Sequence, residues 1–169
     1  GLYNLACCEA RLGETDAAIE MGFFVAGEGR RFYGQTTTSA VPNKTALVLR
    51  QPLGVAGLII AANTPIANVA WKAFPALLCG NACVFKPAED VPHTGHILVE
   101  IMLEAGLPPE VIQLVHGLGE TAGAAIVNHP LIPVISFTGS TDTGRIVGET
   151  CGRMHKRLSL EMGGKNAMI

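Results

Sequence analysis

The chain has 169 residues, of which 15% are charged and 49% hydrophobic, and its formal net charge is -2. This length suits one ordinary domain or a piece of a larger one, and the low charged fraction favours a piece whose apolar surface meets further segments or subunits. The charge provides no basic footprint for nucleic acid, and no apolar run approaches the roughly 18 residues of a membrane span.

The cysteines and the start of the chain bear on its compartment. The five cysteines are an odd number scattered through the sequence: Cys7, Cys8, Cys79, Cys83 and Cys151. They indicate buried thiols in a reducing compartment and not a disulfide framework. No signal peptide is visible at the start, so we expect a cytoplasmic protein. His93 and His96 lack the i, i+4 spacing of a helical metal pair, and we expect no metal site.

The N-terminal quarter is predicted to be helical and then irregular. Residues 1–27 carry a helix-compatible apolar pattern that is broken at Gly13 and Gly22, which predicts one or two helices. The polar residues 30–43 are typical of a connector. Residues 45–50 are rich in β-forming side chains and predict a strand that ends in a turn at Pro52 and Gly54.

From Val55 onward, apolar strand-like runs alternate with helical stretches. The runs are centred near Leu58, Val84, Leu114, Ile135 and Leu158. Their spacing of roughly 20 to 30 residues is typical of βαβ units. The sequence therefore predicts an α/β fold, a doubly wound parallel sheet.

Three crossover helices are predicted between these strands. The first begins after Asn63 and Thr64, with Pro65 suited to the first helical position, and Pro75 should kink or end it. The second covers residues 93–105, and the third covers residues 120–128.

Residues 134–145 predict a strand that enters a helix through a turn of small residues. Free backbone N–H groups at a helix N-terminus form a site for phosphate. Gly139 would allow close approach of a ligand, Ser140 and Thr141 can cap the helix, and Gly144 permits tight packing. The stretch lacks the GxGxxG spacing, and an ordinary strand-to-helix turn remains the alternative.

Polar and small residues follow each of the five predicted strands. Because ligands bind beyond the carboxyl ends of the strands in open α/β sheets, these groups should meet at one rim. They are Ala61-Ala62-Asn63, Lys86-Pro87-Ala88-Glu89, His116-Gly117-Leu118-Gly119, Thr138-Gly139-Ser140 and Glu161-Met162-Gly163-Gly164.

Seven motifs together resemble the aldehyde dehydrogenase superfamily. They are Ile59-Ile60-Ala61-Ala62-Asn63-Thr64-Pro65, Trp71-Lys72, Pro75-Ala76-Leu77, Gly80-Asn81, Lys86-Pro87-Ala88-Glu89, Phe137-Thr138-Gly139-Ser140-Thr141 and Leu160-Glu161-Met162-Gly163-Gly164-Lys165-Asn166. The resemblance implies NAD(P)-dependent oxidation of an aldehyde to a carboxylic acid through a cysteine thioester.

Two residues match the catalytic positions of that family. Asn63 matches the asparagine whose side-chain amide stabilises the oxyanion, and its alternative is a helix N-cap. Glu161 matches the general base that activates the deacylating water, and its alternative is a solvated carboxylate at a strand end.

The resemblance also implies the cofactor site, which we expect to prefer NAD and to accept NADP more weakly. Lys86 and Glu89 match the pair at the adenosine ribose and would otherwise be a surface charge pair. The adenine and pyrophosphate environment is implied at Gly119, Gly123, Phe137, Gly139, Ser140 and Thr143. Its walls are implied at the backbone of Ile59, Ile60 and Met162, with close cofactor approach at Gly163. We expect Trp71 to belong to the core.

The chain departs from the family pattern in two ways. Ala61 and Ala62 stand where the family usually has Pro-Trp. The family's nucleophilic cysteine follows the segment that contains Glu161, so we expect it beyond Ile169 and the chain alone to be inactive.

The resemblance implies three parts: a helical segment and connector at 1–44, an oligomerisation arm at 45–53 and an incomplete dinucleotide-binding domain at 54–169. The intact protein is then expected to be a homo-oligomer that acts on an aldehyde. A non-catalytic dinucleotide-binding module and an acyl-phosphate reductase on the same fold remain as alternatives.

Overall fold

Five parallel strands form the central sheet of the computed structural model, which describes the backbone of residues 2–164 and the side chains of residues 13–164. The strand order is β5-β4-β3-β6-β7. The strands are β3 (Val55–Ile59), β4 (Ala82–Lys86), β5 (Ile112–Leu114), β6 (Val134–Thr138) and β7 (Arg157–Glu161). The doubly wound sheet predicted from the alternation of strands and helices is confirmed.

The direction of winding reverses between β3 and β6. From β3 the chain adds β4 and β5 on one side, then crosses back and adds β6 and β7 on the other. Ile59 at the carboxyl end of β3 is in register with Lys86 of β4 and with Phe137 of β6. Because neighbouring loops leave the sheet in opposite directions here, a crevice opens at this switch point.

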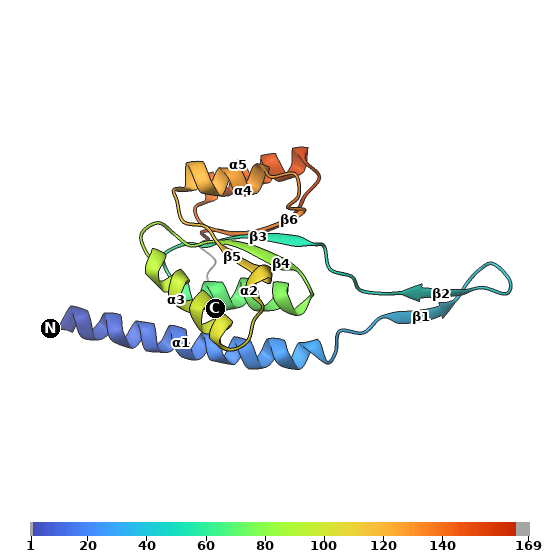
Figure 1. Ribbon diagram of the computed structural model, residues 1–169. Helices are drawn as coiled ribbons and strands as arrows, with labels where there is room; N and C mark the ends of the chain where they lie inside the picture. Colours follow the sequence, from blue (N-terminus) through green and yellow to red (C-terminus); the bar gives the residue numbers. More distant parts are fainter. Residues whose placement is uncertain (1, 165–169) are drawn as a thin grey trace.

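Helices cover both faces of the sheet. Figure 1 shows α2 (Pro65–Leu78) and α3 (Pro92–Glu104) below it, and α4 (Ala124–Asn128) and α5 (Thr141–Arg153) above it. Each face has its own buried cluster, one built around Leu58, Val69 and Phe85 and the other around Ile135 and Phe137. Both faces of β3 are therefore buried, in keeping with its continuous apolar sequence.

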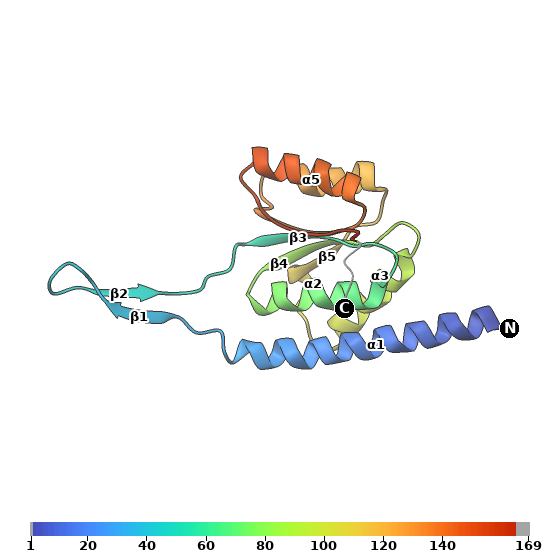
Figure 2. The ribbon, with the colours of Figure 1, turned by 180° about the vertical axis from the view of Figure 1, so that it is seen from behind.

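The N-terminal segment is one long helix, α1 (Leu2–Gly29), which lies along the outer side of α2, as both ribbon views show (Figures 1 and 2). This single helix falls within the prediction of one or two helices, and the breaks in the apolar pattern at Gly13 and Gly22 do not interrupt it. A Cβ at Gly22 would lie 3.5 Å from the Phe74 ring, an ordinary van der Waals contact, so Gly22 lies where α1 packs against α2. Packing between helices outweighs the modest cost of glycine within a helix.

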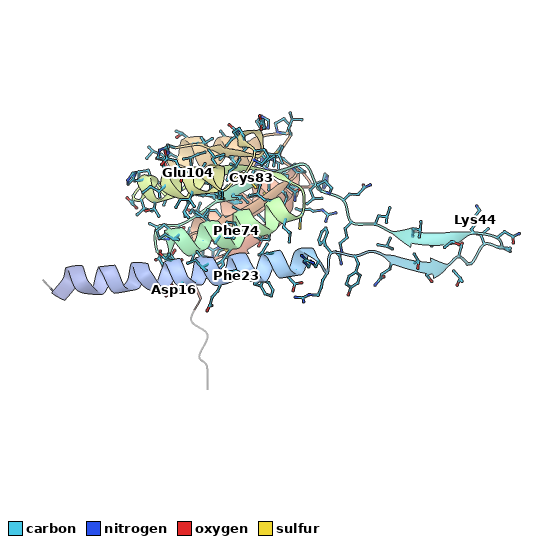
Figure 3. The ribbon with its side chains drawn as sticks, turned by 60° about the horizontal axis from the view of Figure 1, so that its bottom comes forward. Asp16, Phe23, Lys44, Phe74, Cys83 and Glu104 are labelled. Atoms are coloured by element: carbon cyan, nitrogen blue, oxygen red, sulfur yellow. The ribbon has the colours of Figure 1, made fainter. Side chains whose placement is uncertain are left out.

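The segment predicted as a connector contains a strand, β1 (Gln35–Thr38), which pairs antiparallel with β2 (Thr45–Val48). The prediction had a strand at 45–50 but missed its partner, because the run of threonines was interpreted only as polar. Threonine is β-branched and favours strands. The hairpin extends away from the sheet, and Lys44 lies at its far end (Figure 3).

Two helices differ in detail from the prediction. Pro75 lies within α2, which continues to Leu78 and ends before Gly80 in the left-handed region (φ 78°). Pro75 therefore does not end the helix. The helix predicted at 120–128 begins as a π-helical turn, η2 (Gly119–Gly123), which continues into α4.

Some predictions fall outside the described part of the chain. Lys165 and Asn166 of the last motif lie in residues 165–169, and the side chains of Cys7 and Cys8 lie in residues 2–12. Within the described residues, no helix is both long enough and apolar enough to span a membrane. The domain boundaries after residues 44 and 53 stay predictions.

Candidate functional site

The turn between β6 and α5 lies at the switch point and has the predicted strand-to-helix geometry. Ser140 is the N-cap of α5, and its hydroxyl accepts a hydrogen bond from the Thr143 backbone N–H at 3.2 Å. Gly139 donates its backbone N–H to the Glu161 carbonyl at 3.1 Å, which ties the turn to the end of β7. A Cβ on Gly139 would lie 2.5 Å from the Phe137 ring, so only glycine fits here without rearrangement.

A cleft of about 770 Å³, here called the α2-side cleft, opens between the start of α2 and the ends of β6 and β7. It brings together catalytic and cofactor residues that were predicted from separate strand ends. The predicted residues that line it are Asn63, Gly139, Ser140, Glu161, Met162 and Gly163. Ser136, Thr138 and Ser159 of β6 and β7 also line this cleft.

The floor of the cleft is polar because β6 and β7 present hydroxyls and a carboxylate on this face. Thr138 is in register with Glu161, and Ser136 with Ser159. The buried Thr138 hydroxyl has no hydrogen-bond partner within the described part of the chain. A ligand or water in the cleft could complete its hydrogen bonding.

Lys72 of α2 reaches this floor and was not singled out by the sequence interpretation. Its side chain is buried, and its Nζ donates to the Ser136 hydroxyl at 2.9 Å. Burial lowers the pKa of Lys72, and the nearby Glu161 carboxylate partly opposes that shift. The alternation of Ser136 and Thr138 along β6 was the available signal that this face meets a polar cleft.

Asn63 lies at the mouth of the cleft, one residue before Thr64, which is the N-cap of α2. The alternative interpretation of Asn63 as that cap was therefore wrong. The Asn63 side-chain oxygen accepts a hydrogen bond from Asn68 Nδ2 at 3.4 Å. Its Nδ2 group has no hydrogen bond within the described residues, so a donor is available at the cleft.

A second pocket of about 490 Å³, here called the α5-side pocket, lies across the sheet edge between β3, β6, α4 and α5. The predicted residues that line it are Ile59, Glu89, Gly119, Gly123, Phe137 and Thr143. A Cβ added at Gly119 would have no atom within 4 Å, and one added at Gly123 would meet only Lys86 carbons at 3.7 Å or more. The pocket wall there is therefore bare backbone.

Lys86 and Glu89 form an ion pair beside this pocket, with 3.0 Å between Nζ and Oε2. Lys86 is 2% exposed and also donates to the Pro87 carbonyl, whereas the Glu89 side chain is 43% exposed. The pair is therefore not an ordinary surface charge pair. The Glu89 pKa is held below its usual value by the backbone N–H of Glu89, then by Lys86, with a smaller effect of the Gly119 N–H.

Other predicted residues lie elsewhere. The Ile60 side chain is 3% exposed and packs in the cluster on the α2 face, and the wall implied at its backbone stays a prediction. Trp71 is 45% exposed and lines the α2-side cleft, so its assignment to the core was wrong. It stands next to Lys72 on α2 and contributes to the wall of the cleft.

The cysteines whose side chains are described do not line the cleft. Cys83 and Cys151 are buried, as expected, and Cys79 is partly buried. Burial raises the pKa of the Cys83 thiol to about 12, so this thiol stays protonated at neutral pH. No group of three potential metal-ligating side chains occurs among the described residues.

A doubly wound parallel sheet with cavities beside the carboxyl ends of its strands near the switch point defines the class of Rossmann-like α/β domains. The comparisons place the chain within this class. The family whose model matches is described as "Aldehyde dehydrogenase family", over residues 6–169. The chain belongs to the aldehyde dehydrogenase family.

Individual relatives show how much of the family's length is present. Phenylacetaldehyde dehydrogenase of Pseudomonas fluorescens is 42% identical over 165 residues, which are 95% of this chain and 33% of the relative. Human retinaldehyde dehydrogenase 3 is 44% identical over 157 residues, covering 92% of this chain and 30% of the relative. The chain thus spans about a third of these relatives.

Solved structures agree with this assignment. An NAD⁺ complex of an aldehyde dehydrogenase from Bacillus cereus matches with a TM-score of 0.85 and 38% identity, over 89% of this chain and 30% of that one. A structure described as an Escherichia coli NADP-dependent enzyme matches with a TM-score of 0.87 and 38% identity, over 90% and 32%.

Proposed function

We propose that this chain supplies the dinucleotide-binding part, the oxyanion-stabilising amide and the general base of an NAD-dependent aldehyde dehydrogenase. The nucleophilic cysteine would lie outside residues 1–169. The observation that carries the proposal is the convergence of Asn63 and Glu161 on the α2-side cleft, with the α5-side pocket across the edge of the sheet. A dinucleotide is long enough to occupy both cavities across the sheet edge.

The α5-side pocket suits the adenosine half of the cofactor. Its bare wall at Gly119 and Gly123 leaves room for a flat ring, and the exposed Glu89 carboxylate can accept hydrogen bonds from ribose hydroxyls. The buried Lys86 ammonium orients Glu89 through their ion pair. The nicotinamide half would then reach the α2-side cleft, where the cofactor supplies the hydride acceptor.

Asn63 and Glu161 act in two different steps, formation of the oxyanion and hydrolysis of the thioester. The Asn63 amide can donate a hydrogen bond to the oxyanion that forms at the aldehyde carbon, and a neutral donor does not hold the carboxylate product as an ion pair would. Glu161 is exposed in the cleft, where its carboxylate can take a proton from the water that hydrolyses the thioester. Gly163 and Gly164 follow it and leave its backbone room to move.

The test separates acylation from hydrolysis in the full-length enzyme. Glu161→Gln keeps the size of the side chain but removes the base, so it should give a burst of about one NADH per active site and then almost no turnover. Rapid-mixing absorbance at the NADH band measures the burst. Normal steady-state turnover by Glu161→Gln would contradict the role of Glu161, and absence of aldehyde-dependent NADH from the wild type would contradict the proposed activity.

A further inference from the structure

Three polar side chains form a small cluster at the start of α2, beside the α2-side cleft. Asn68 lies one turn into the helix and is 4% exposed. Its Nδ2 donates to the Thr64 hydroxyl at 2.8 Å and to the Asn63 side-chain oxygen at 3.4 Å. A buried amide that directs both of its protons at two neighbours has little freedom to rotate.

Thr64 holds Asn68 in this orientation. As the N-cap of α2, Thr64 could use its hydroxyl to cap its own helix, but it makes no such hydrogen bond. The hydroxyl accepts from Asn68 instead. The Asn68 backbone N–H also donates to the Thr64 carbonyl at 2.9 Å, which fixes the spacing of the two residues.

The hydrogen bond from Asn68 decides which end of the Asn63 amide faces the cleft. An asparagine side chain has one end that only accepts and one end that only donates. Because the Asn63 oxygen is engaged by Asn68, its Nδ2 group lies at the opposite end of the amide and is free to donate to a ligand in the cleft that Asn63 lines. A flipped Asn63 would place two NH₂ groups against each other and leave an acceptor facing the reacting carbonyl.

We propose that Asn68 is a positioning residue that selects the amide orientation of Asn63, so that a hydrogen-bond donor faces the developing oxyanion. The inference rests on the proposed role of Asn63. Asn68 lines the α2-side cleft, and the role proposed for it is to act through its neighbour Asn63.

The kinetic test compares two replacements of Asn68 in the full-length enzyme. Asn68→Leu removes the hydrogen bond without replacing it, so kcat should fall only a few-fold as the Asn63 amide samples both orientations. Asn68→Asp, although closer in shape to asparagine, places an ionised acceptor next to Asn63 and should reverse the amide. Its kcat should fall by about 100-fold, as when one oxyanion donor is lost.

Two further readouts separate positioning from a loss of packing. Combining Asn63→Ala with Asn68→Asp should be no worse than Asn63→Ala alone, because both remove the same donor. The activity of Asn68→Asp relative to wild type should rise at lower pH, since a protonated carboxyl can donate to the Asn63 oxygen again. The dissociation constant for NAD should be the same in Asn68→Asp as in the wild type. Asn43→Asp at the hairpin turn is the matched control, because it makes the same replacement away from the cleft.

A measurement on the wild-type chain tests the geometry without variants or catalysis. In a spectrum of the chain labelled with ¹⁵N-asparagine, the Asn68 side-chain amide protons should exchange slowly with solvent and those of Asn63 quickly. The opposite pattern would overturn the proposal, as would a smaller loss for Asn68→Asp than for Asn68→Leu. A full-length enzyme that oxidises no aldehyde would contradict the proposed function while leaving the exchange result to decide the orientation of Asn63.

Discussion

At the scale of single residues, we propose that Glu89 sets the choice between cofactors. Its carboxylate lies in the α5-side pocket and is held ionised by its own backbone N–H, by Lys86 and by the Gly119 N–H. The hydroxyls of an NAD ribose can donate to a carboxylate, whereas the phosphate of NADP brings a further negative charge of about -1.5 to -2. Lys86 offsets part of this repulsion.

We expect Glu89→Ser to shift the preference toward NADP by at least about tenfold, because repulsion between nearby charges costs on the order of 1 to 4 kcal/mol. Titrations of wild type and variant with each cofactor measure the ratio of dissociation constants. Glu110→Ser, at an exposed carboxylate outside both cavities, is the control. If the wild type binds both cofactors equally, or if the ratio is unchanged in the variant, Glu89 does not contact the ribose.

Lys72 is a buried charge, and we expect it to lower the stability of the fold. It is a buried ammonium that donates to the Ser136 hydroxyl, and burial lowers its pKa from the usual 10.5. Lys72→Met should raise the stability of the fold by about 1 kcal/mol, since replacing a buried charge by an apolar side chain is often favourable. The melting temperature would rise by about 2 to 4 °C.

The gain should depend on pH in a defined direction. Because the folded pKa is depressed, the unfolded state binds more protons between that pKa and 10.5, and wild-type stability rises with pH in this window. The advantage of Lys72→Met should therefore shrink as pH rises toward 10.5. If the difference in unfolding free energy between the variant and the wild type stays constant across this range, the buried ammonium is not its cause. Lys44→Met at the hairpin tip controls for the loss of a surface charge.

At the scale of elements, α4 forms one wall of the α5-side pocket and is held at its C-terminal end by Lys156. The Lys156 ammonium donates to the Val127 and His129 carbonyls, each at 2.6 Å. A cation at the C-terminal end of a helix meets unpaired carbonyls and the negative end of the helix dipole. This contact fixes a helix of only five residues.

Lys156→Met should lower the free energy of unfolding by about 1 to 3 kcal/mol, because two carbonyls lose a charged donor. It should also weaken NAD binding several-fold by loosening the wall of the pocket. Urea unfolding and cofactor titration measure the two effects, and Lys156→Arg should retain most of both. If stability and affinity both stay at wild-type levels, α4 does not depend on this contact.

The elements show why some structure was predictable from sequence and some was not. The strands of the sheet were predicted because buried parallel strands are continuous apolar runs bounded by turn residues. The sequence left open whether the N-terminal segment forms one helix or two, and it missed the strand β1. Both depend on packing and pairing: Gly22 meets Phe74 of α2, and Thr36 pairs with Leu47 of β2.

The site was predictable to a different extent. Residues at strand ends could be grouped because parallel strands end at one rim, and Asn63, Gly139 and Glu161 do line one cleft. Their division between two cavities depends on which face of the sheet each side chain takes. Asn68 and Lys72 lie within a helix and reach the cleft only through tertiary packing. No local pattern marked Asn68, and the Trp71-Lys72 motif gave Lys72 no role.

At the scale of the whole molecule, we propose that the two cavities together form one site for an extended ligand. Phe137 and Gly139 lie on the edge between them, with Phe137 lining the α5-side pocket and Gly139 the α2-side cleft. The central claim is that one dinucleotide spans this edge, with its adenosine next to Glu89 and its nicotinamide next to Glu161.

Titrating the ¹⁵N-labelled chain with NAD and recording backbone amide shifts tests this claim most directly. We predict saturable shifts at Gly119 and Gly123 in the α5-side pocket and at Gly139 and Gly163 in the α2-side cleft, while Gly106 at the end of α3 stays constant. AMP alone should move only Gly119 and Gly123. A folded chain in which NAD moves none of these four amides, or moves only residues away from the switch point, would contradict a dinucleotide site across this edge.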